Sequence, residues 1–281
     1  MRALTTEVVH HLWERMRDLI PEPVDEHPLG CHRRRVSDEL CLLGLLFRLV
    51  TGCSWEDAEV LLGHQVSDTT LRTRRNEWVN AGVFDQLFQG ALADFDRAGL
   101  LQVRHSSADG SLHKAPCGGP GSGANPTDRG KLGWKWVILV DANGMPIGWV
   151  IAGANRQDSV LLADTIDSVP AKYRRKIRWL HLDRGFDNRN VRAQLDERGL
   201  SDACIARKRP RGKPDAPLPA PKFKGRRWPV ERTNSWISNY GQMRRNTDRR
   251  PEHRHAQLAL VVTLLIVIKL IDHERQRSPI R

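Results

Sequence analysis

The stretch Lys135-Trp-Val-Ile-Leu-Val-Asp-Ala-Asn-Gly-Met-Pro-Ile-Gly-Trp-Val-Ile-Ala152 decides the fold class that the sequence predicts. It contains two apolar runs rich in β-branched residues, 135–141 and 146–152, and such runs are typical of strands. Ala142-Asn-Gly144 joins them, and Asn-Gly between two strand patterns indicates a hairpin turn. The stretch therefore predicts an antiparallel hairpin within a domain that also contains helices.

The segments on either side extend this hairpin into an α/β domain. Strand patterns and helix patterns alternate, and a helix begins at Pro229 and runs past Trp236. The predicted strands outside the hairpin are 103–109, 178–183 and 203–207, and the other predicted helices are 159–169 and 188–197. The order β-β-β-α-β-α-β-α is that of the ribonuclease H fold. We therefore expect an α/β, ribonuclease H-like catalytic core.

The first hundred residues show helix patterns instead of strand patterns. Three helices are predicted with serine caps at Ser37, Ser54 and Ser67, over residues 38–50, 55–62 and 68–79. The last two helices and the short turn between them match a helix-turn-helix motif, in which Arg72, Arg74 and Arg75 are candidate DNA contacts. The alternative is a plain helical bundle with a solvated basic face.

These patterns predict two domains. Residues 1–100 form an all-α, helix-turn-helix-like DNA-binding region. Residues 101–281 form the catalytic domain, which carries a basic insertion at 207–228 and a C-terminal helix at 252–273. The five cysteines are odd in number and form no Cys-x-x-Cys pair, which favours reduced thiols in a cytoplasmic protein. The apolar run 258–271 contains Lys269 and is shorter than the ~20 residues of a membrane span, so we expect a buried helix and no membrane.

The chain is strongly and unevenly basic. Its 281 residues carry 45 Lys and Arg against 33 Asp and Glu, a net charge of +12, which excludes an acid-rich disordered chain or a charge-balanced metabolic enzyme acting on a small molecule. Residues 1–100 carry 11 basic and 16 acidic residues (−5), whereas residues 101–281 carry 34 and 17 (+17). A polyanionic partner should therefore bind mainly to the C-terminal two thirds.

Three carboxylates lie at special positions in the predicted core. Asp109 and Asp183 end predicted strands, and Glu231 lies in the first turn of the helix that begins at Pro229. Such positions converge on one edge of an open α/β sheet. Three carboxylates without thiolate or imidazole neighbours suit Mg²⁺ or Mn²⁺, and two such ions can promote phosphodiester displacement. For each residue taken alone, the alternative is a turn-capping role.

A basic segment leads directly into Glu231. Residues 207–232 hold ten Lys and Arg against Asp215 and Glu231, a local charge of +8. We interpret this segment as a track for the DNA backbone, and the alternative is a solvated or disordered linker. The DNA contacts expected outside the first hundred residues are Lys131, Arg184, Lys208, Arg209, Arg211, Lys222, Lys224, Arg226, Arg227, Arg232, Arg244 and Arg245.

Four motifs stand in order along the chain: Ala108-Asp-Gly-Ser111, Pro126-x-Asp-Arg-Gly-Lys131, Leu182-Asp-Arg-Gly-Phe-Asp187 and Arg227-Trp-x-Val-Glu-Arg-Thr-x-x-Trp236. Together they resemble a bacterial insertion-sequence transposase of the DDE type, from the group that includes insertion sequence five. The resemblance implies that Asp109, Asp183 and Glu231 bind metal. It also implies a homodimer that acts on double-stranded DNA and lies in the cytoplasm at the nucleoid. This dimer would cut the transposon ends and join them to target DNA.

The sequence departs from this family around the glutamate. The family pattern has Tyr seven residues before it, Arg four before it and Lys seven after it, and this chain has Lys224, Arg227 and Ser238 there. Only Arg227 agrees. Two alternatives to a transposase therefore stay open: a catalytically decayed or domesticated DNA-binding protein, and a metal-dependent nuclease that cuts DNA without joining it.

Overall fold

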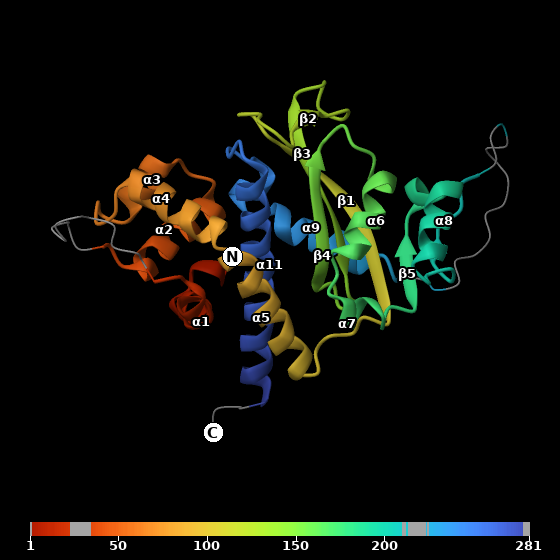
Figure 1. Cartoon of the computed structure of the whole chain (residues 1–281), viewed down its shortest axis with the longest axis horizontal. Helices are drawn as coiled ribbons and strands as arrows, with labels where there is room; N and C mark the ends of the chain where they lie inside the picture. The colour runs from red at the N-terminus through yellow and green to blue at the C-terminus, as the bar shows by residue number, and fades with distance from the viewer. Residues whose placement is uncertain (1, 23–34, 210–211, 213–222, 224, 278–281) are drawn as a thin grey trace. The chain divides into compact units, whose positions relative to one another are not determined.

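The computed structural model describes residues 2–22, 35–209, 212, 223 and 225–277, and it contains two compact units (Figure 1). Unit 1 comprises Met1–Ala98, Asn239–Asn246 and Glu252–Arg281, and unit 2 comprises Gly99–Ser238 and Thr247–Pro251. The chain therefore returns to unit 1 at Asn239, contributes Thr247–Pro251 to unit 2 and ends in unit 1. This division differs from the sequence-based one, which assigned the whole of 101–281 to a single domain.

Unit 2 is built on a six-stranded mixed sheet. Its strands follow the order β2-β3-β1-β5-β6, and β4 pairs with β3. Their bounds are His105–Lys114 (β1), Gly123–Ala124 (β2), Leu132–Val140 (β3), Pro146–Gly153 (β4), Trp179–Leu182 (β5) and Cys204–Ile205 (β6). The predicted hairpin is confirmed, because β3 and β4 are antiparallel and their turn contains Gly144 with a φ of 83°. β1, β5 and β6 run parallel to one another.

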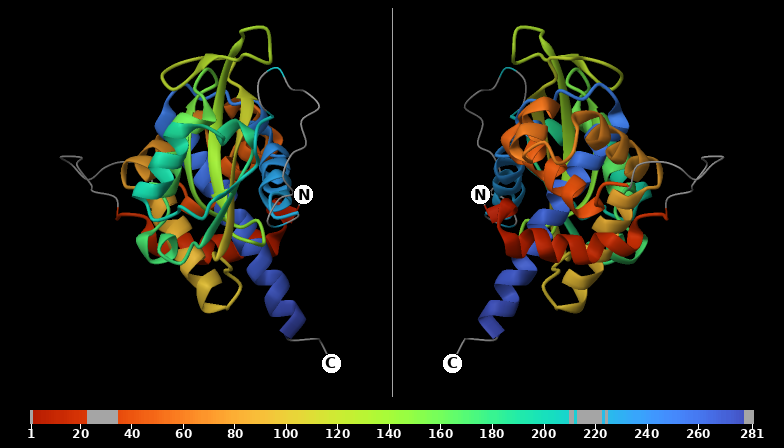
Figure 2. Two further views of the ribbon diagram at one scale, coloured as in Figure 1. Left: turned by 90° about the vertical axis from the view of Figure 1, so that its right-hand side faces the viewer. Right: turned by 90° about the vertical axis from the view of Figure 1, so that its left-hand side faces the viewer.

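Helices cover both faces of this sheet. They are α6 (Asp158–Asp167), α7 (Ala171–Arg174), α8 (Arg189–Glu197) and α9 (Trp228–Ser238), with a 3₁₀ turn η3 at Arg184–Phe186. Side chains alternate between the two faces along β3. Trp136 donates a hydrogen bond to Asn234 of α9, whereas Lys135 donates one to Asp158 of α6. α6 and α9 therefore lie on opposite faces, and Figure 2 shows the sheet standing between α9 and α8.

Unit 1 is all-helical. Its helices are α1 (Thr6–Met16), α2 (Asp38–Thr51), α3 (Trp55–Leu61), α4 (Asp68–Asn80), α5 (Val83–Arg97), α10 (Gly241–Arg244) and α11 (Pro251–Arg277), with 3₁₀ turns η1 (Arg2–Leu4) and η2 (Arg17–Leu19). α2 ends at Gly52, whose φ of 80° suits glycine. A Cβ on Gly241 would lie 2.3 Å from the Gly52 nitrogen, so both glycines permit close packing of α10 against the end of α2.

The predicted helix caps are partly confirmed. Ser54 and Asp57 form a reciprocal capping box, and the Ser67 side chain accepts a hydrogen bond from the Thr70 amide. Ser37 precedes α2 as expected, but its side chain caps no amide in the described part of the chain, so that prediction is wrong. The side chain of Asn188 accepts from the Val191 amide and caps α8.

α11 is the long apolar helix that the sequence predicts at 252–273. Among the described residues it is the one helix long and apolar enough to cross a membrane by length and composition, and 67% of its most apolar window is buried. Its buried residues include Leu258, Val262 and Ile266, which repeat with helical spacing. From Glu252 onward, α11 groups with the helices of unit 1, and its many buried residues are typical of a helix inside a core.

Candidate active site

Asp109 lies in the middle of β1, and Asp183 directly follows β5, the parallel strand next to it. β1 and β5 pair in a register that places Ser107 beside His181, and each aspartate lies two residues further along its own strand direction. Because side chains alternate, the two aspartates follow their paired neighbours onto one face of the sheet. α9 covers this face. Asp109 pairs with Ile138 of β3, whose side chain lies on the same face as that of Trp136, and Trp136 donates a hydrogen bond to Asn234 of α9. The structure thus brings together two of the three expected carboxylates.

Each aspartate is oriented by a local backbone hydrogen bond. The Gly110 amide donates to Oδ1 of Asp109 at 2.9 Å. Asp183 directly follows β5 and begins η3, where its Oδ1 accepts from the Gly185 amide at 2.7 Å. A Cβ on Gly185 would lie 2.9 Å from Oδ1 of Asp183, so glycine permits this close approach. These contacts explain the Asp-Gly and Asp-Arg-Gly spacing of the two motifs.

Burial makes the charge of Asp109 unfavourable. It raises the pKa of Asp109 to about 6, and the nearby carboxylates of Asp183 and Asp158 act in the same direction. The Arg227 guanidinium opposes them and lowers the same pKa. A group of this kind gains strongly from a nearby cation, because the cation offsets both the lost hydration and the repulsion between carboxylates.

Glu231 lies in the first turn of α9, which packs on β1 and β3. Its carboxylate forms an ion pair with Arg227 at 3.1 Å, one helical turn away, and is about half exposed. Arg227 therefore interacts with Glu231 directly and with Asp109 electrostatically. The third expected carboxylate faces an arginine and is not gathered with the two aspartates.

The donor chemistry of this site fits a hard divalent cation. Asp109 and Asp183 supply carboxylate oxygens, which Mg²⁺ and Mn²⁺ prefer. Among the residues that the structure describes, no three His, Cys, Asp or Glu side chains already form a group able to hold a metal ion. The aspartate pair is thus a suitable partial site for such a cation.

Three hydrogen bonds fix α9 to the sheet next to Glu231. Trp136 Nε1 donates to Asn234 Oδ1 at 2.8 Å, and Thr233 Oγ1 donates to the Gly144 carbonyl at 2.6 Å. Arg232 donates to the Asn143 carbonyl in the same hairpin turn. The turn that identifies the hairpin in the sequence therefore also anchors the helix of Glu231. Sequence reasoning missed this role of Asn234 and Thr233, although both lie inside the Glu231 motif.

A basic groove of about 880 Å³ lies between β5, β6 and the start of α9. Glu231 and Arg227 line it, together with Arg184, Arg207 and Arg226. Lys208 and Arg209 follow β6 and are exposed. The expected contacts Arg211, Lys222 and Lys224 lie outside the described residues. The described part of the basic segment thus borders the candidate active site.

The other expected DNA contacts of the C-terminal region have different surroundings. Lys131 is exposed before β3, and Arg244 and Arg245 are exposed at α10. Arg232 stacks between two indoles, with its guanidinium 4.6 Å from the Trp228 ring centre and 4.5 Å from that of Trp236. Because Arg232 also bonds to the hairpin, it is chiefly a packing residue of α9.

The arginines of the helix-turn-helix segment point largely inward. Arg74 is buried and forms ion pairs with Asp38 and Glu77, and Arg75 is buried with its guanidinium 4.8 Å from the Trp55 ring centre. They share the buried stripe of α4 with Leu71 and Trp78, and the sequence-based choice overlooked this spacing. Their charge is therefore not offered to DNA.

Arg72 is the more exposed of the three arginines of α4. Its side chain is 43% exposed, and its guanidinium pairs with Glu56 at 3.0 Å and with Asp68 at 3.1 Å. Both partners belong to the same helix-turn-helix segment. The ion pairs compensate the charge of Arg72 locally, which weakens any attraction that it exerts on a phosphate.

The structure defines an α/β protein that carries two aspartates at neighbouring strands of its sheet and a basic groove. Residues 102–267 match the family model described as "Transposase DDE domain", and residues 9–88 match "Putative transposase of IS4/5 family". The first match covers more than half of the chain. The chain belongs to the DDE transposases of insertion sequences, of the IS4/5 type.

Two relatives from Burkholderia cepacia agree with this membership. The chain is 32% identical over 154 residues to the "Putative transposase for insertion sequence element IS402", a match that covers 53% of this chain and 69% of the relative. It is 31% identical over 115 residues to the "Insertion element IS402 uncharacterized 16.2 kDa protein", covering 41% of this chain and 78% of the relative. No solved structure matches the chain.

Proposed function

We propose that the protein binds the terminal inverted repeats of its own insertion sequence, cuts them in a metal-dependent reaction and transfers the freed strand to target DNA. The observation that carries this proposal is the placement of Asp109 and Asp183 in one row of adjacent parallel strands, on the face that α9 covers. The order of the strands also supports a ribonuclease H-like assignment for unit 2.

In this proposal Asp109, Asp183 and Glu231 hold one or two Mg²⁺ or Mn²⁺ ions. When bound, such ions activate an attacking oxygen and stabilise the leaving oxygen of a phosphodiester. The protein supplies orientation. Backbone amides fix the two aspartates, and the helix of Glu231 is fixed by the hydrogen bond that Asn234 accepts from Trp136 and by the one that Thr233 donates to Gly144. Arg227 holds Glu231 in the free protein, and a DNA phosphate is a suitable alternative partner for its guanidinium.

The basic groove is proposed to bind the DNA backbone beside the aspartates. Its described cations include Arg184, Arg207, Arg226 and Arg227, and Lys208 and Arg209 extend the same charge. Arginine binds phosphate oxygens through two parallel hydrogen bonds, which suits a track that positions the scissile strand. We further propose that the partners are double-stranded transposon ends and target DNA. The protein acts on this DNA as a homodimer, at the nucleoid in the bacterial cytoplasm.

The first test is cleavage and joining of a DNA that carries the flanking inverted repeats, with and without Mg²⁺. Asp109→Ala, Asp183→Ala and Glu231→Ala should each lower turnover by at least about 100-fold, because each removes a charged ligand that acts in the transition state. Asp196→Ala, on an exposed surface of α8, is the matched control and should keep normal turnover. Normal turnover in any variant of the three carboxylates would refute the role of that residue.

A second candidate is a DNA-binding protein that has lost its chemistry. The ion pair between Glu231 and Arg227 favours it, because that contact leaves the two aspartates without the third carboxylate. Binding of the repeats without cleavage at any Mg²⁺ or Mn²⁺ concentration would support this candidate. A nuclease that cuts and never joins is distinguished by its products, since strand transfer creates a new phosphodiester bond with the target.

A further inference from the structure

A buried lysine and an aspartate form an ion pair on the face of the sheet opposite to Asp109. Lys135 of β3 is 5% exposed, and its ammonium group donates to the Asp158 carboxylate and to the Arg156 carbonyl, the latter at 2.9 Å. Asp158 is the first residue of α6, and its side chain is about one third exposed. A buried ammonium group is unfavourable unless paired, so the partners hold each other in place.

Asp158 lies directly behind the strand segment that carries Asp109. A Cβ on Gly110 would come within 2.4 Å of the Asp158 carboxyl carbon, so glycine permits the carboxylate to contact the backbone of β1 at this point. The amide of the same Gly110 donates to Asp109. One residue of backbone therefore separates the ion pair from the proposed metal ligand.

This proximity has an electrostatic effect. Because only the backbone of Gly110 lies between the Asp158 carboxylate and Asp109, the charge of Asp158 adds to the negative potential at Asp109. Lys135 compensates the charge of Asp158 from the α6 face. The negative potential that Asp109 and Asp183 present to a cation therefore depends on how completely Lys135 balances Asp158.

We propose that Lys135 and Asp158 are positioning residues that set the affinity of the Asp109 and Asp183 pair for a divalent cation from behind the strand. This inference rests on the proposed function and goes beyond it, because neither residue belongs to the three expected ligands. Asp158 contributes attraction for the cation, and Lys135 limits that attraction and holds the Asp158 carboxylate against Gly110.

The two charges should have opposite effects on cation binding when they are removed. Asp158→Asn leaves the ammonium group of Lys135 without its counter-ion behind Asp109, which repels a cation. Lys135→Met leaves the Asp158 carboxylate uncompensated, which attracts one. The double variant removes both charges and should resemble the wild type. A purely structural role predicts weaker binding in both single variants.

The experiment measures Mn²⁺ binding to the full chain without DNA, by titration calorimetry or by the electron paramagnetic resonance of free Mn²⁺. Asp158→Asn should raise the dissociation constant about tenfold and Lys135→Met should lower it about tenfold, with the double variant within about threefold of wild type. Circular dichroism at the same temperature verifies folding. If Lys135→Met does not fold, Asp158→Asn and the double variant still differ in the predicted direction.

A matched pair on the surface of unit 2 provides the control. Lys114 and Asp128 lie 4.0 Å apart, and Lys114→Met and Asp128→Asn make the same charge changes away from Gly110. Both should bind Mn²⁺ as the wild type does. Asp109→Ala should abolish binding.

If the wild type binds no Mn²⁺ at the site of Asp109, the metal chemistry of the proposed function fails and this inference with it. If the wild type binds and both single variants shift in one direction, or neither shifts, only this inference is overturned.

Discussion

Asp141 illustrates how a single buried residue connects the hairpin to the rest of unit 2. It follows β3, it has no exposed surface, and its carboxylate accepts hydrogen bonds from three backbone amides: Oδ2 from Gln102 at 2.9 Å, and Oδ1 from Asn143 at 2.9 Å and from Met145 at 2.8 Å. Burial nevertheless raises the pKa of Asp141 to about 6. Asp141 therefore organises the turn that anchors α9, and the proposed chemistry does not involve its charge.

We predict that Asp141→Asn lowers the free energy of unfolding by about 1–3 kcal/mol, because the new amide group donates where the backbone also donates. The midpoint of thermal unfolding should fall by about 2–10 °C. Calorimetry at pH 7 measures this change. Asp196→Asn, an exposed residue of α8, makes the same chemical change and should stay within about 0.5 kcal/mol of wild type. An equal midpoint for Asp141→Asn and wild type would contradict the structural role.

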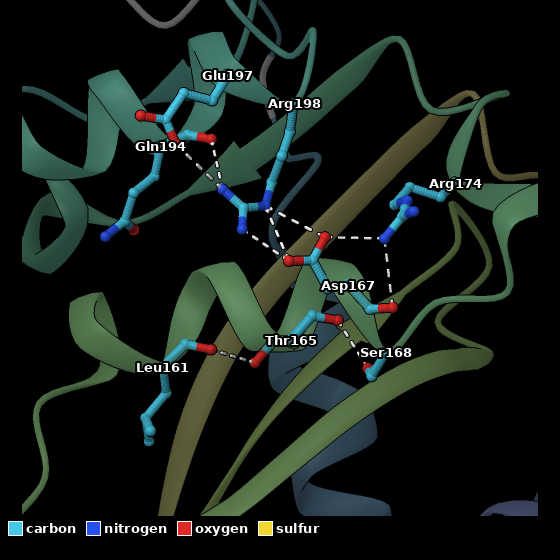
Figure 3. Close-up of polar contacts among 8 residues, drawn as sticks. All are labelled: Leu161, Thr165, Asp167, Ser168, Arg174, Gln194, Glu197 and Arg198. Carbon is cyan, nitrogen blue, oxygen red and sulfur yellow. Dashed lines mark hydrogen bonds and ion pairs between the residues drawn. The ribbon is translucent and has the colours of Figure 1, made fainter.

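At the scale of elements, the C-terminal ends of α6 and α8 are joined by one carboxylate (Figure 3). Asp167 Oδ2 accepts from Arg198 Nη2 at 2.7 Å, and Asp167 Oδ1 accepts from Arg174 Nη1 at 2.8 Å. Hydrogen bonds from Arg198 hold the pKa of Asp167 below its usual range. Because Arg198 caps α8, this contact holds α8 on the face of the sheet that α6 also covers.

The lowered pKa of Asp167 fixes the sign of a pH effect. The contact stabilises the protein above the ordinary pKa of an aspartate, and the stabilisation is lost as the pH falls through the lower folded value. Arg198→Gln should therefore lower the unfolding midpoint by about 1–3 °C at pH 7 and have no effect near pH 2. Thermal unfolding over this pH range tests the prediction. Arg175→Gln, an exposed residue after α7, is the control for the charge change. An equal effect of Arg198→Gln at both pH values would contradict it.

At the scale of the whole molecule, charge is divided unevenly along the chain. Residues 1–100 carry a net charge of −5, and residues 101–281 carry +17. The ion pairs of Arg72 and Arg74 reduce the positive potential of the helix-turn-helix segment further. Electrostatic affinity for DNA should therefore come mainly from the basic groove, whereas the first hundred residues should contribute little of it.

We predict that the double variant Arg207→Gln with Arg226→Gln lowers DNA affinity and its dependence on salt. Each lost phosphate contact should reduce the slope of the logarithm of affinity against the logarithm of salt concentration by about 1. Fluorescence anisotropy at salt concentrations from about 50 mM to about 300 mM measures these slopes. Arg17→Gln with Arg97→Gln removes two exposed arginines of unit 1 and should keep the wild-type slope. Equal slopes for the two double variants would contradict the placement of the DNA track.

Local sequence patterns predicted every strand of the described sheet except the two-residue β2, and they predicted most of the helices. They also predicted that two of the three carboxylates lie near each other. The two apolar strand patterns and the Asn-Gly turn between them depend only on residues that are neighbours in the chain. The sequence alone therefore predicts the β3–β4 hairpin. The sequence predicted that Asp109 and Asp183 meet because both end strand patterns. For Asp109 that premise is wrong, since it lies in the middle of β1, and the two aspartates meet because β5 ends beside the middle of that longer strand. The basic segment 207–232 needed only its composition.

Only the tertiary structure decided which charges are paired and which elements share a core. Arg74 and Arg75 resemble DNA contacts in the sequence, but their helical spacing with Leu71 and Trp78 turns them inward once α4 packs. Glu231 pairs with Arg227, Asp158 pairs with Lys135, and α11 joins the helices of unit 1. The pairing of Asp158 with Lys135 and the place of α11 depend on contacts between segments far apart in the chain, and composition and spacing carry no information about which distant surfaces meet. The pairing of Glu231 with Arg227, four residues earlier, depends instead on the conformation adopted where α9 begins.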